Sequence, residues 1–345
     1  MSQAAPCVKC LVWDLDDTVW DGVLLEGGGQ ALRPGVRETI EQLDARGILH
    51  SIASKNEPEP ALRRLRELGL ADYFLYPQIS WGPKSAALER IASALNIGVG
   101  SVAFIDDQEF ERDEVCFAQP AVLCLDAREA TRLPEHPRFQ PRFVTDESAR
   151  RRDMYLSSIV RGQAEHEFAG TDQEFLAQLG MVFTISTART EDLRRAEELT
   201  VRTHQLNSTG RTFSYEELDE LTRSPDHLVL VAALTDRYGD YGTIGLAVVA
   251  KQPGSWRILL LLMSCRVMSR GVGAVLLNRL QVMAHDAGVV LRADFVPTDR
   301  NRVMYVTYRF AGFTDVDGQD GRLGLEWVDG AVPTVPTHLR LVMCG

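Results

Sequence analysis

Three aspartates, Asp14, Asp16 and Asp17, stand in four positions directly after an apolar run. Carboxylates at the end of a buried strand are unfavourable unless a cation or a reaction needs them there. Asp14 and Asp16 lie two positions apart and therefore leave the strand on the same side. A pair of carboxylates suits Mg²⁺, which prefers hard oxygen ligands. One carboxylate beside such an ion can attack phosphorus, and a second can protonate the leaving oxygen.

Phosphoryl chemistry also needs a hydroxyl and a cation to hold the phosphoryl oxygens, and a further carboxylate for the metal. Ser54, Lys84 and the pair Asp106 and Asp107 supply these groups in that order along the chain. We therefore predict a Mg²⁺-dependent phosphoryl site in the first part of the chain.

The surrounding sequence alternates between strand and helix patterns. Strands are predicted at 8–15, 49–54 and 101–107, and amphipathic helices at 35–47, 58–70 and 82–97. This alternation predicts an α/β fold with a parallel sheet and helices on both faces. Ligands of such sheets bind beyond the carboxyl ends of the strands, which is where the candidate residues stand.

A second candidate for chemistry is Cys265, at the end of the apolar strand predicted at 256–265. A Gly-rich turn and a helix predicted at 272–288 follow it. A helix N-terminus and the flanking Arg266 and Arg270 would favour a thiolate. A buried core cysteine is the alternative reading of the position.

The length of 345 residues favours two domains. We expect a first domain at 1–130, a linker or helical segment at 131–175, which starts Pro- and Arg-rich, and a second α/β domain at 176–345. The second domain has more antiparallel hairpin character.

A net charge of −11 argues against general nucleic-acid binding. No apolar run is long enough to span a membrane, and no signal peptide is evident, so we expect a cytoplasmic protein without a membrane partner. Cys7 and Cys10 form a lone pair of the CxxC type, which is a poor zinc candidate.

The motifs "DLDDT", "SK", "PKS" and "IDD" resemble, in order and placement, the four signature motifs of the haloacid dehalogenase-like superfamily. The resemblance implies that Asp14 is the nucleophile and Asp16 the acid or base. It implies Mg²⁺ as cofactor, with Asp14, Asp16 through its backbone, Asp106 and Asp107 as candidate ligands. Candidate phosphate-binding residues are Thr18, Ser54, Lys55, Asn56 and Lys84. The gaps between motifs are too short for a cap domain, so we expect a capless site that is open or is covered by the linker and the second domain. An open site favours a large or tethered substrate.

The second domain resembles the acetyltransferase superfamily, whose pantetheine groove opens at a splayed pair of central strands. Gly271 and Gly273 fit the signature of that family, but Met268 stands where it has Arg or Gln. That departure disfavours free coenzyme A and leaves a phosphopantetheine arm as the expected thiol donor or acceptor.

Over nearly its full length the chain is similar to the FkbH-like family of glyceryl transferase/phosphatases of polyketide biosynthesis. The motifs that carry this resemblance are "RTHQLNST", "DRYGDYGTIG", "MSCRVMSRGVG" and "FVPTDRNRVMY". It implies 1,3-bisphosphoglycerate as substrate, a thioester on Cys265, and transfer of the glyceryl group to an acyl carrier protein.

Gln205 and Asn207 match this family and are candidate substrate or oxyanion donors. His204 stands where the family has Asn, and it is either a base or part of a hydrogen-bond network. Asp240 and His285 are further candidate acids or bases, although His285 is better explained as a residue of a helix surface. Arg266 and Arg270 are candidate substrate contacts. Docking of an acidic carrier protein is expected at Arg266, Arg270, Arg300 and Arg302. The alternatives are lactyl transfer, a Mg²⁺-dependent phosphatase joined to a coenzyme A-dependent acyltransferase, and a non-enzymatic docking module.

Overall fold

The computed structural model describes residues 7–27, 31–203, 205–318, 321–327 and 334–344. The chain forms two compact units, Met1–Leu156 and Ser157–Gly345. The division falls inside the segment 131–175, for which a linker was predicted, and within helix α6 (Arg151–Glu167). Each unit is described by itself.

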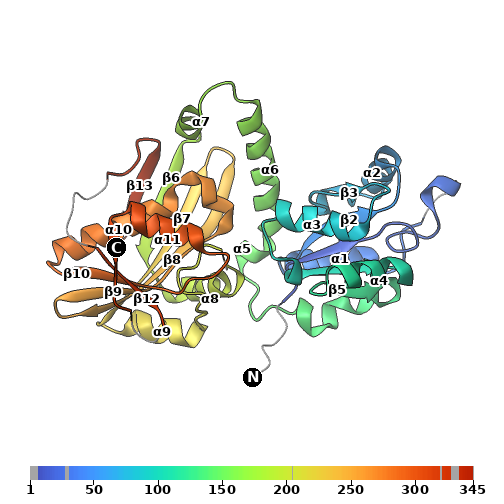
Figure 1. Ribbon diagram of the computed structural model, residues 1–345. Coiled ribbons are helices and arrows are strands. Elements are labelled where there is room, and N and C mark those ends of the chain that lie inside the picture. The colour runs from blue at the N-terminus through green and yellow to red at the C-terminus, as the bar shows by residue number, and fades with distance from the viewer. Residues whose placement is uncertain (1–6, 28–30, 204, 319–320, 328–333, 345) are drawn as a thin grey trace. The chain divides into compact units, whose positions relative to one another are not determined.

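The first unit is built on a five-stranded sheet with the order β3-β2-β1-β4-β5 (Figure 1). All four strand pairings in it are parallel, as predicted. Its strands are β1 (Cys10–Trp13), β2 (Leu49–Ser54), β3 (Gln78–Ile79), β4 (Val102–Asp106) and β5 (Leu123–Asp126). Because all the strands run the same way, their carboxyl ends share one edge of the sheet.

Helices cover both faces of this sheet. They are α1 (Val36–Ala45), α2 (Pro58–Glu67), α3 (Lys84–Ala94) and α4 (Glu109–Ala118). Apolar residues of α1 and α2 share one core with the sheet, while α3 and α4 contact each other. The right-handed crossover rule explains this division, because the chain moves outward from β1 through α1 and α2 and returns past it through α3 and α4.

The end of the first unit is more ordered than a linker. The 3₁₀ segment η4 (Ala127–Glu135) and η5 (Pro137–Phe139) follow β5, and Leu133 and Phe139 are buried in the core. Short α5 (Asp146–Ala149) begins with a capping box of Thr145 and Ser148.

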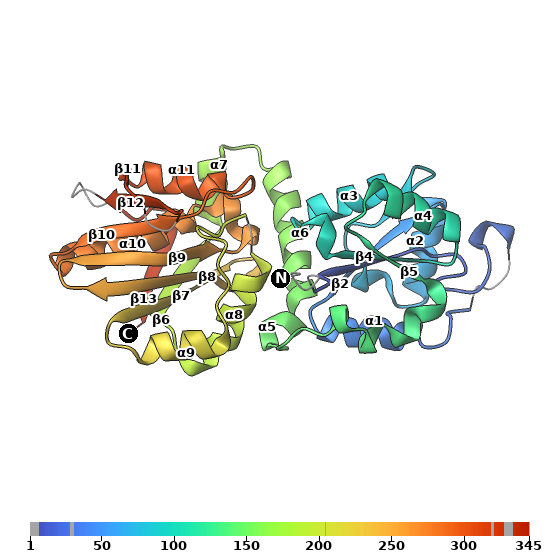
Figure 2. The same ribbon diagram turned by 60° about the horizontal axis from the view of Figure 1, so that its bottom comes forward.

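The second unit is built on an eight-stranded mixed sheet with the order β11-β12-β10-β9-β8-β7-β6-β13 (Figure 2). The pairs β9–β10 and β6–β13 are parallel, and the others are antiparallel. The strands are β6 (Met181–Thr187), β7 (His227–Asp236), β8 (Gly239–Gln252), β9 (Ser255–Met263), β10 (Val290–Phe295), β11 (Phe313–Val316), β12 (Leu323–Trp327) and β13 (Leu339–Cys344). The expected α/β fold class is confirmed for both units.

Helices α10 (Val272–Asp286) and α11 (Arg302–Phe310) pack on one face of the mixed sheet. On the other face, α8 (Leu193–Arg202) and α9 (Tyr215–Arg223) cover β7, β8 and β9. Helix α7 (Asp172–Gln178) leads into β6. The sequence patterns did not predict α9, β11, β12 or β13. Within the described ranges, no helix combines the length and apolar character that crossing a bilayer requires.

Candidate functional site

Three strand ends of the first unit bring the predicted phosphoryl residues together. Asp14 follows β1, and its backbone N–H donates to the Ile105 carbonyl of β4 at 3.0 Å. Asp106 is the last residue of β4, and Ser54 is the last residue of β2 on the other side of β1. The parallel register therefore places these three side chains side by side, all buried.

Lys84, the first residue of α3, joins the two carboxylates. Its Nζ lies 2.7 Å from Asp14 Oδ1 and 2.5 Å from Asp106 Oδ2. All three side chains are at most 6% exposed. A buried ammonium between two buried carboxylates leaves one negative charge in excess, which can be balanced by a cation.

The protonation of this cluster is strongly perturbed. The pKa of Asp14 is raised to about 7, because burial and the charge of Asp106 raise it by more than Lys84 and a hydrogen bond with Ser54 lower it. Burial by itself would lower the pKa of Lys84, but the two carboxylates raise it more, so the pKa stands above its ordinary value. A carboxylate with a raised pKa in a buried charged cluster is typical of a functional site.

A metal ion fits the same place. Asp14, Asp106 and Asp107 each offer a ligand atom, and these atoms lie within 4.8 Å of one another. Asp107 Oδ1 is buried and accepts no hydrogen bond from the described part of the chain. Its backbone N–H donates to Thr18 Oγ1 at 3.2 Å, which fixes the loop. An orphaned buried oxygen beside two further carboxylates is the donor set that Mg²⁺ takes.

Asp16 stands apart from this cluster. Its Oδ1 accepts from Trp20 Nε1 at 2.8 Å and from the Leu24 backbone N–H at 3.1 Å, and its Oδ2 accepts from Asn56 Nδ2 at 3.0 Å. The carboxylate is therefore held by neighbours outside the Asp14, Asp106 and Asp107 group. This leaves only the Asp16 backbone for the predicted ligand role, while the acid or base role stays a prediction.

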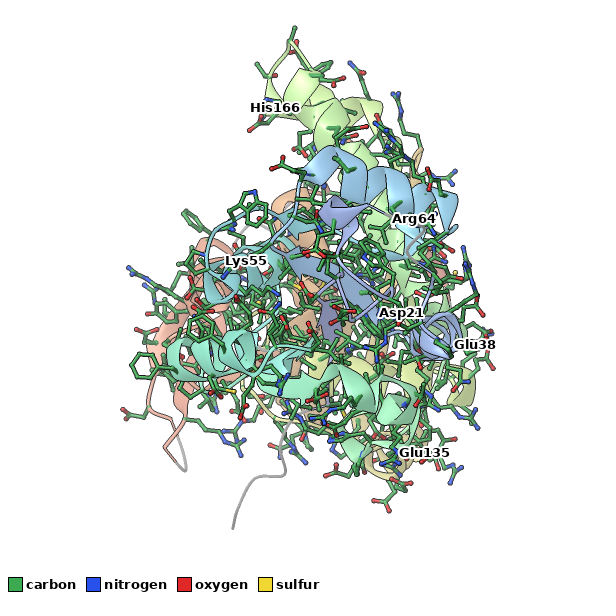
Figure 3. The ribbon with its side chains drawn as sticks, turned by 90° about the vertical axis from the view of Figure 1, so that its right-hand side faces the viewer. Asp21, Glu38, Lys55, Arg64, Glu135 and His166 are labelled. Carbon is green, nitrogen blue, oxygen red and sulfur yellow. The ribbon has the colours of Figure 1, made fainter. Side chains whose placement is uncertain are left out.

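The remaining predicted phosphate contacts have partners of their own. Lys55 Nζ lies 2.5 Å from Oε1 of the buried Glu111 on α4, and Asn56 positions Asp16. Figure 3 looks onto the side of the molecule where Lys55 and Asp21 lie. The sequence motif placed Lys55 and Asn56 near the site but did not reveal these partners, because Glu111 is one of several acidic residues in α4.

Sequence reasoning also missed Arg112. Its Nη1 donates to the Asp106 carbonyl at 2.8 Å, and its Nη2 lies 3.1 Å from Asp126 Oδ2 at the end of β5. Together with Arg33 and Asp107, Arg112 lines an open recess of about 370 Å³. Arg112 thus holds the backbone that carries the candidate metal ligands, and no motif marks it.

The second candidate, Cys265, begins the 3₁₀ segment η7 (Cys265–Arg270) directly after β9 and is half-buried. Gly271, with φ of 72°, separates this segment from α10, which begins at Val272. The thiol therefore stands at the start of η7 and not at the N-terminus of the long helix. Arg270 is buried and binds Glu165 with Nη2–Oε2 and Nη1–Oε1 distances of 2.9 and 3.2 Å. Its guanidinium is thus engaged with a carboxylate.

The central strands part next to Cys265, as the acetyltransferase resemblance implied. Pairing of β9 with β10 ends at Ile258 and Ala293. Beyond that point the residues 206–208 hydrogen-bond to β9, where Ser208 N–H donates to the Leu261 carbonyl at 3.0 Å and Met263 N–H to the Leu206 carbonyl at 2.9 Å. On the other side, Val296 N–H donates to the Ser208 carbonyl at 3.0 Å. The chain itself therefore occupies the space between the parted strands.

The other candidates of the second unit do not gather around Cys265 in one buried cluster. Asn207 is buried, and its side chain is engaged within its own turn by accepting from Thr209 and Gly210 N–H. Asp240 is exposed and accepts from Gly242 N–H at 2.7 Å. His285 is 54% exposed on α10, and Gln205 is half-buried. His204 lies outside the described residues.

A buried charged cluster in this unit was not predicted. Arg161 of α6 donates to both oxygens of Asp236, at 2.6 and 3.0 Å, and Tyr241 Oη donates to Asp236 Oδ2 at 2.9 Å. The Arg161 and Asp236 side chains are at most 3% exposed. The "DRYGDYG" motif contained Asp236, but sequence reasoning selected the exposed Asp240 from it.

A family model and several solved structures match parts of the chain. Residues 23–110 match the model of the haloacid dehalogenase-like hydrolase family, a stretch that includes Ser54, Lys84, Asp106 and Asp107 but begins after Asp14. No curated protein matches the chain. Among solved structures, the N-terminal part of BF1531 from Bacteroides fragilis, containing a phosphatase domain complexed with Mg, is 25% identical. The match covers 44% of this chain and 39% of that one, with a TM-score of 0.32.

Other similar structures are acetyltransferases. The ribosomal-protein-S18-alanine N-acetyltransferase from Escherichia coli is 18% identical over 44% of this chain and 99% of that one, with a TM-score of 0.33. The putative acetyltransferase yncA from Salmonella typhimurium, solved with acetyl-CoA, is 19% identical over 44% of this chain and 98% of that one, with a TM-score of 0.32.

Proposed function

We propose that this chain is a Mg²⁺-dependent glyceryl transferase and phosphatase. In this proposal the chain accepts the glyceryl group of 1,3-bisphosphoglycerate on Cys265, removes the remaining phosphate at Asp14, and passes glyceryl to the phosphopantetheine thiol of an acyl carrier protein. The observation that carries the phosphatase part is Lys84 between Asp14 and Asp106, beside the orphaned oxygen of Asp107. The acyl-transfer part rests on the sequence resemblance and on Cys265.

The geometry supports a division of labour in the first unit. Asp14 is a strand-end carboxylate in contact with the Lys84 ammonium, and in its ionised form it can attack a phosphoryl group. Lys84 and Ser54 can hold the phosphoryl oxygens, and Asp16 can give a proton to the leaving oxygen once the substrate reaches it. Mg²⁺ held by Asp14, Asp106 and Asp107 would offset the charge of the phosphoryl oxygens.

The proposed transfer of the glyceryl group takes place in three steps. The Cys265 thiolate attacks the acyl phosphate carbon, the C–O bond to phosphate breaks, and a C–S bond forms as inorganic phosphate leaves. Hydrolysis of the phosphate ester at the Asp14 site releases a second phosphate. The carrier thiol then attacks the thioester, and Cys265 leaves as a thiolate.

Intact-protein mass spectrometry after incubation with 1,3-bisphosphoglycerate and Mg²⁺ tests both parts. Wild type is expected to carry a glyceryl adduct and Cys265→Ala none. Asp14→Asn should accumulate an adduct heavier by one phosphoryl group, because acylation precedes the lost hydrolysis. If wild type gains no adduct on Cys265 while still releasing phosphate from a monoester, the transferase part is wrong and the phosphatase part stands.

Lactyl transfer and coenzyme A-dependent acylation are separate outcomes of the same assay. An adduct formed from a lactyl donor in place of glyceryl would change the substrate assignment. Labelling from acetyl-coenzyme A, with none from 1,3-bisphosphoglycerate, would instead favour a phosphatase joined to a coenzyme A-dependent acyltransferase.

A further inference from the structure

Two arginines of the second unit lie directly opposite each other on neighbouring strands. Arg257 of β9 and Arg292 of β10 are register partners in the parallel pair. Like charges at directly opposite positions of a sheet destabilise it. A sheet that keeps such a pair on an open face is predisposed to bind an anion there.

In the described part of the chain, the helices α8 and α9 on the face that carries these arginines share no buried apolar cluster with β10. Leu291, Ala293 and Phe295 alternate with Arg292 along β10 and pack in the core that contains α10 and α11. Arg292 therefore points to the opposite face of the sheet. There, the buried apolar cluster under α8 and α9 includes residues of β7, β8 and β9 but, among the residues that the structure describes, none of β10 or β12. The uncovered part forms a recess of about 500 Å³.

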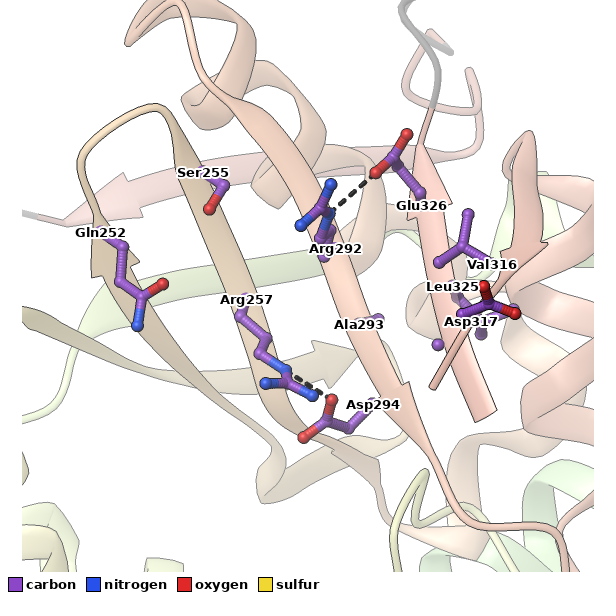
Figure 4. A pocket seen from close by; sticks show the side chains of 11 residues that line it. Gln252, Ser255, Arg257, Arg292, Ala293, Asp294, Val316, Asp317, Leu325 and Glu326 are labelled. Atoms are coloured by element: carbon purple, nitrogen blue, oxygen red, sulfur yellow. Dashed lines mark hydrogen bonds and ion pairs between the residues drawn. The ribbon is translucent and has the colours of Figure 1, made fainter. Parts of the chain in front are cut away.

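Each arginine uses only one edge of its guanidinium. Arg257 Nε donates to Asp294 Oδ1 at 2.6 Å, and Arg292 Nε donates to Glu326 Oε2 at 2.7 Å. In the described part of the chain, their Nη atoms donate no hydrogen bond to protein. Figure 4 shows both side chains on the same face, with Gln252 and Ser255 of the β8–β9 hairpin at one end of the recess.

The recess carries at least as many carboxylates as guanidiniums, so the arginine donors, and not a net positive charge, favour an anion there. Asp294 is 1% exposed and also binds Arg322, with Nη1–Oδ2 of 2.8 Å. The guanidiniums of Arg257, Arg292 and Arg322 therefore bind two carboxylates, Asp294 and Glu326. Asp317 and Val316 line the end of the recess at β11 and β12. Paired Nη donors of arginine match the oxygens of a phosphate or carboxylate.

We propose that this recess is a binding site for a small multivalent oxyanion, with Arg257 and Arg292 as its ligands and Ser255 and Gln252 as polar neighbours. The site is separate from the candidate acyl site, because Arg257 lies roughly 20 Å at strand spacing from Met263, the last residue of β9, and Cys265 lies beyond that strand end. The inference is independent of the glyceryl transfer proposed above.

Calorimetric titration of the full chain in metal-free buffer at low salt tests the site. Inorganic phosphate and citrate are the two probes, and they separate a phosphate ligand from a carboxylate ligand. The Arg257→Gln/Arg292→Gln variant should bind the preferred probe at least tenfold more weakly than wild type. The matched control Arg309→Gln, which removes an exposed arginine paired with Asp315 in the same unit, should bind as wild type does.

Binding at the phosphoryl site does not confuse the result, because both arginines lie in the other unit and that contribution stays in every variant. Arg257→Lys keeps the charge and the fold but loses the paired donors, so it should give an intermediate loss. The proposal is wrong if wild type, the double variant and Arg257→Lys bind phosphate with the same affinity and also bind citrate with the same affinity.

Discussion

The two candidate sites are built in opposite ways. In the first unit, four strand and helix ends converge, and Asp14, Ser54, Lys84 and Asp106 are buried together. In the second unit, Cys265 stands at one strand end, whereas Asp240 and His285 are exposed and Arg270 is bound to Glu165. The difference shows that a parallel sheet brings its candidate functional residues together at one edge, because the carboxyl ends of all its strands meet there. A mixed sheet has no such shared edge, so its functional groups are placed one at a time.

The largest expected effect is on phosphatase activity, which should depend on Asp14 and not on Cys265. Asp14→Asn should reduce phosphate release from a phosphate monoester by at least about 10³-fold, because the attacking carboxylate is lost. Cys265→Ala should leave that rate unchanged, and chelation of Mg²⁺ by EDTA should abolish it. Steady-state phosphate release with each variant measures this. A comparable loss in Cys265→Ala would mean that the sites do not act separately.

The next effect compares the ion pairs at the two sites. Lys84→Met leaves two buried carboxylates without their cation and should cost about 3–5 kcal/mol of unfolding free energy. Added Mg²⁺ should restore part of that loss. Arg270→Met leaves Glu165, which is 35% exposed and can be hydrated, so the cost should be about 1 kcal/mol or less. Urea denaturation with and without Mg²⁺ measures both, and equal losses would contradict the contrast.

The smallest effect uses two histidines, one from each unit. His50 of β2 is buried, accepts from Trp13 Nε1 through Nδ1 at 3.0 Å, and has Nε2 3.1 Å from the Ile40 carbonyl. Burial lowers its pKa to about 3, although the Ile40 carbonyl raises it slightly. The unfolded chain then binds a proton that the folded chain does not. Stability is therefore complete above the unfolded pKa near 6.5 and declines as the pH falls towards 3, by at most about 1.4 kcal/mol per pH unit.

Chemical denaturation between pH 7 and 4 checks this sign. His50→Gln should show a shallower decline than wild type, and His285→Gln, at a side chain that is 54% exposed, should follow the wild-type curve. Parallel curves for wild type and His50→Gln would show that another group dominates the acid sensitivity.

Much of the first unit could be predicted from sequence because its signals are local. Two strands end in a candidate residue, Ser54 and Asp106, and Asp14 directly follows a third strand. Each helix carries its own apolar period, so these three residues could be placed without knowing their contacts. Asp16 marks the limit. Its carboxylate accepts hydrogen bonds from Trp20 and Asn56. Asn56 lies 40 residues further along the chain, so no local sequence pattern predicts that contact.

The second unit was predicted less completely for the same reason. Strands β11, β12 and β13 are short or lie at an edge, and their patterns are weak without the neighbours that bury them. Asp236 and Asp240 stand in one motif with equal propensities, and Asp236 is the one that binds Arg161 of α6 and Tyr241.

By itself, the sequence determined the α/β class, the order of the phosphoryl residues and the position of Cys265 at a strand end. These depend on alternation, helical period and residue type, which are properties of short segments. Only the tertiary structure decided that Lys84 joins Asp14 to Asp106, that residues 206–208 lie between the parted strands, and that Arg257 faces Arg292. Such contacts join residues far apart in the chain, and their energies depend on register and burial that exist only once the sheets have formed.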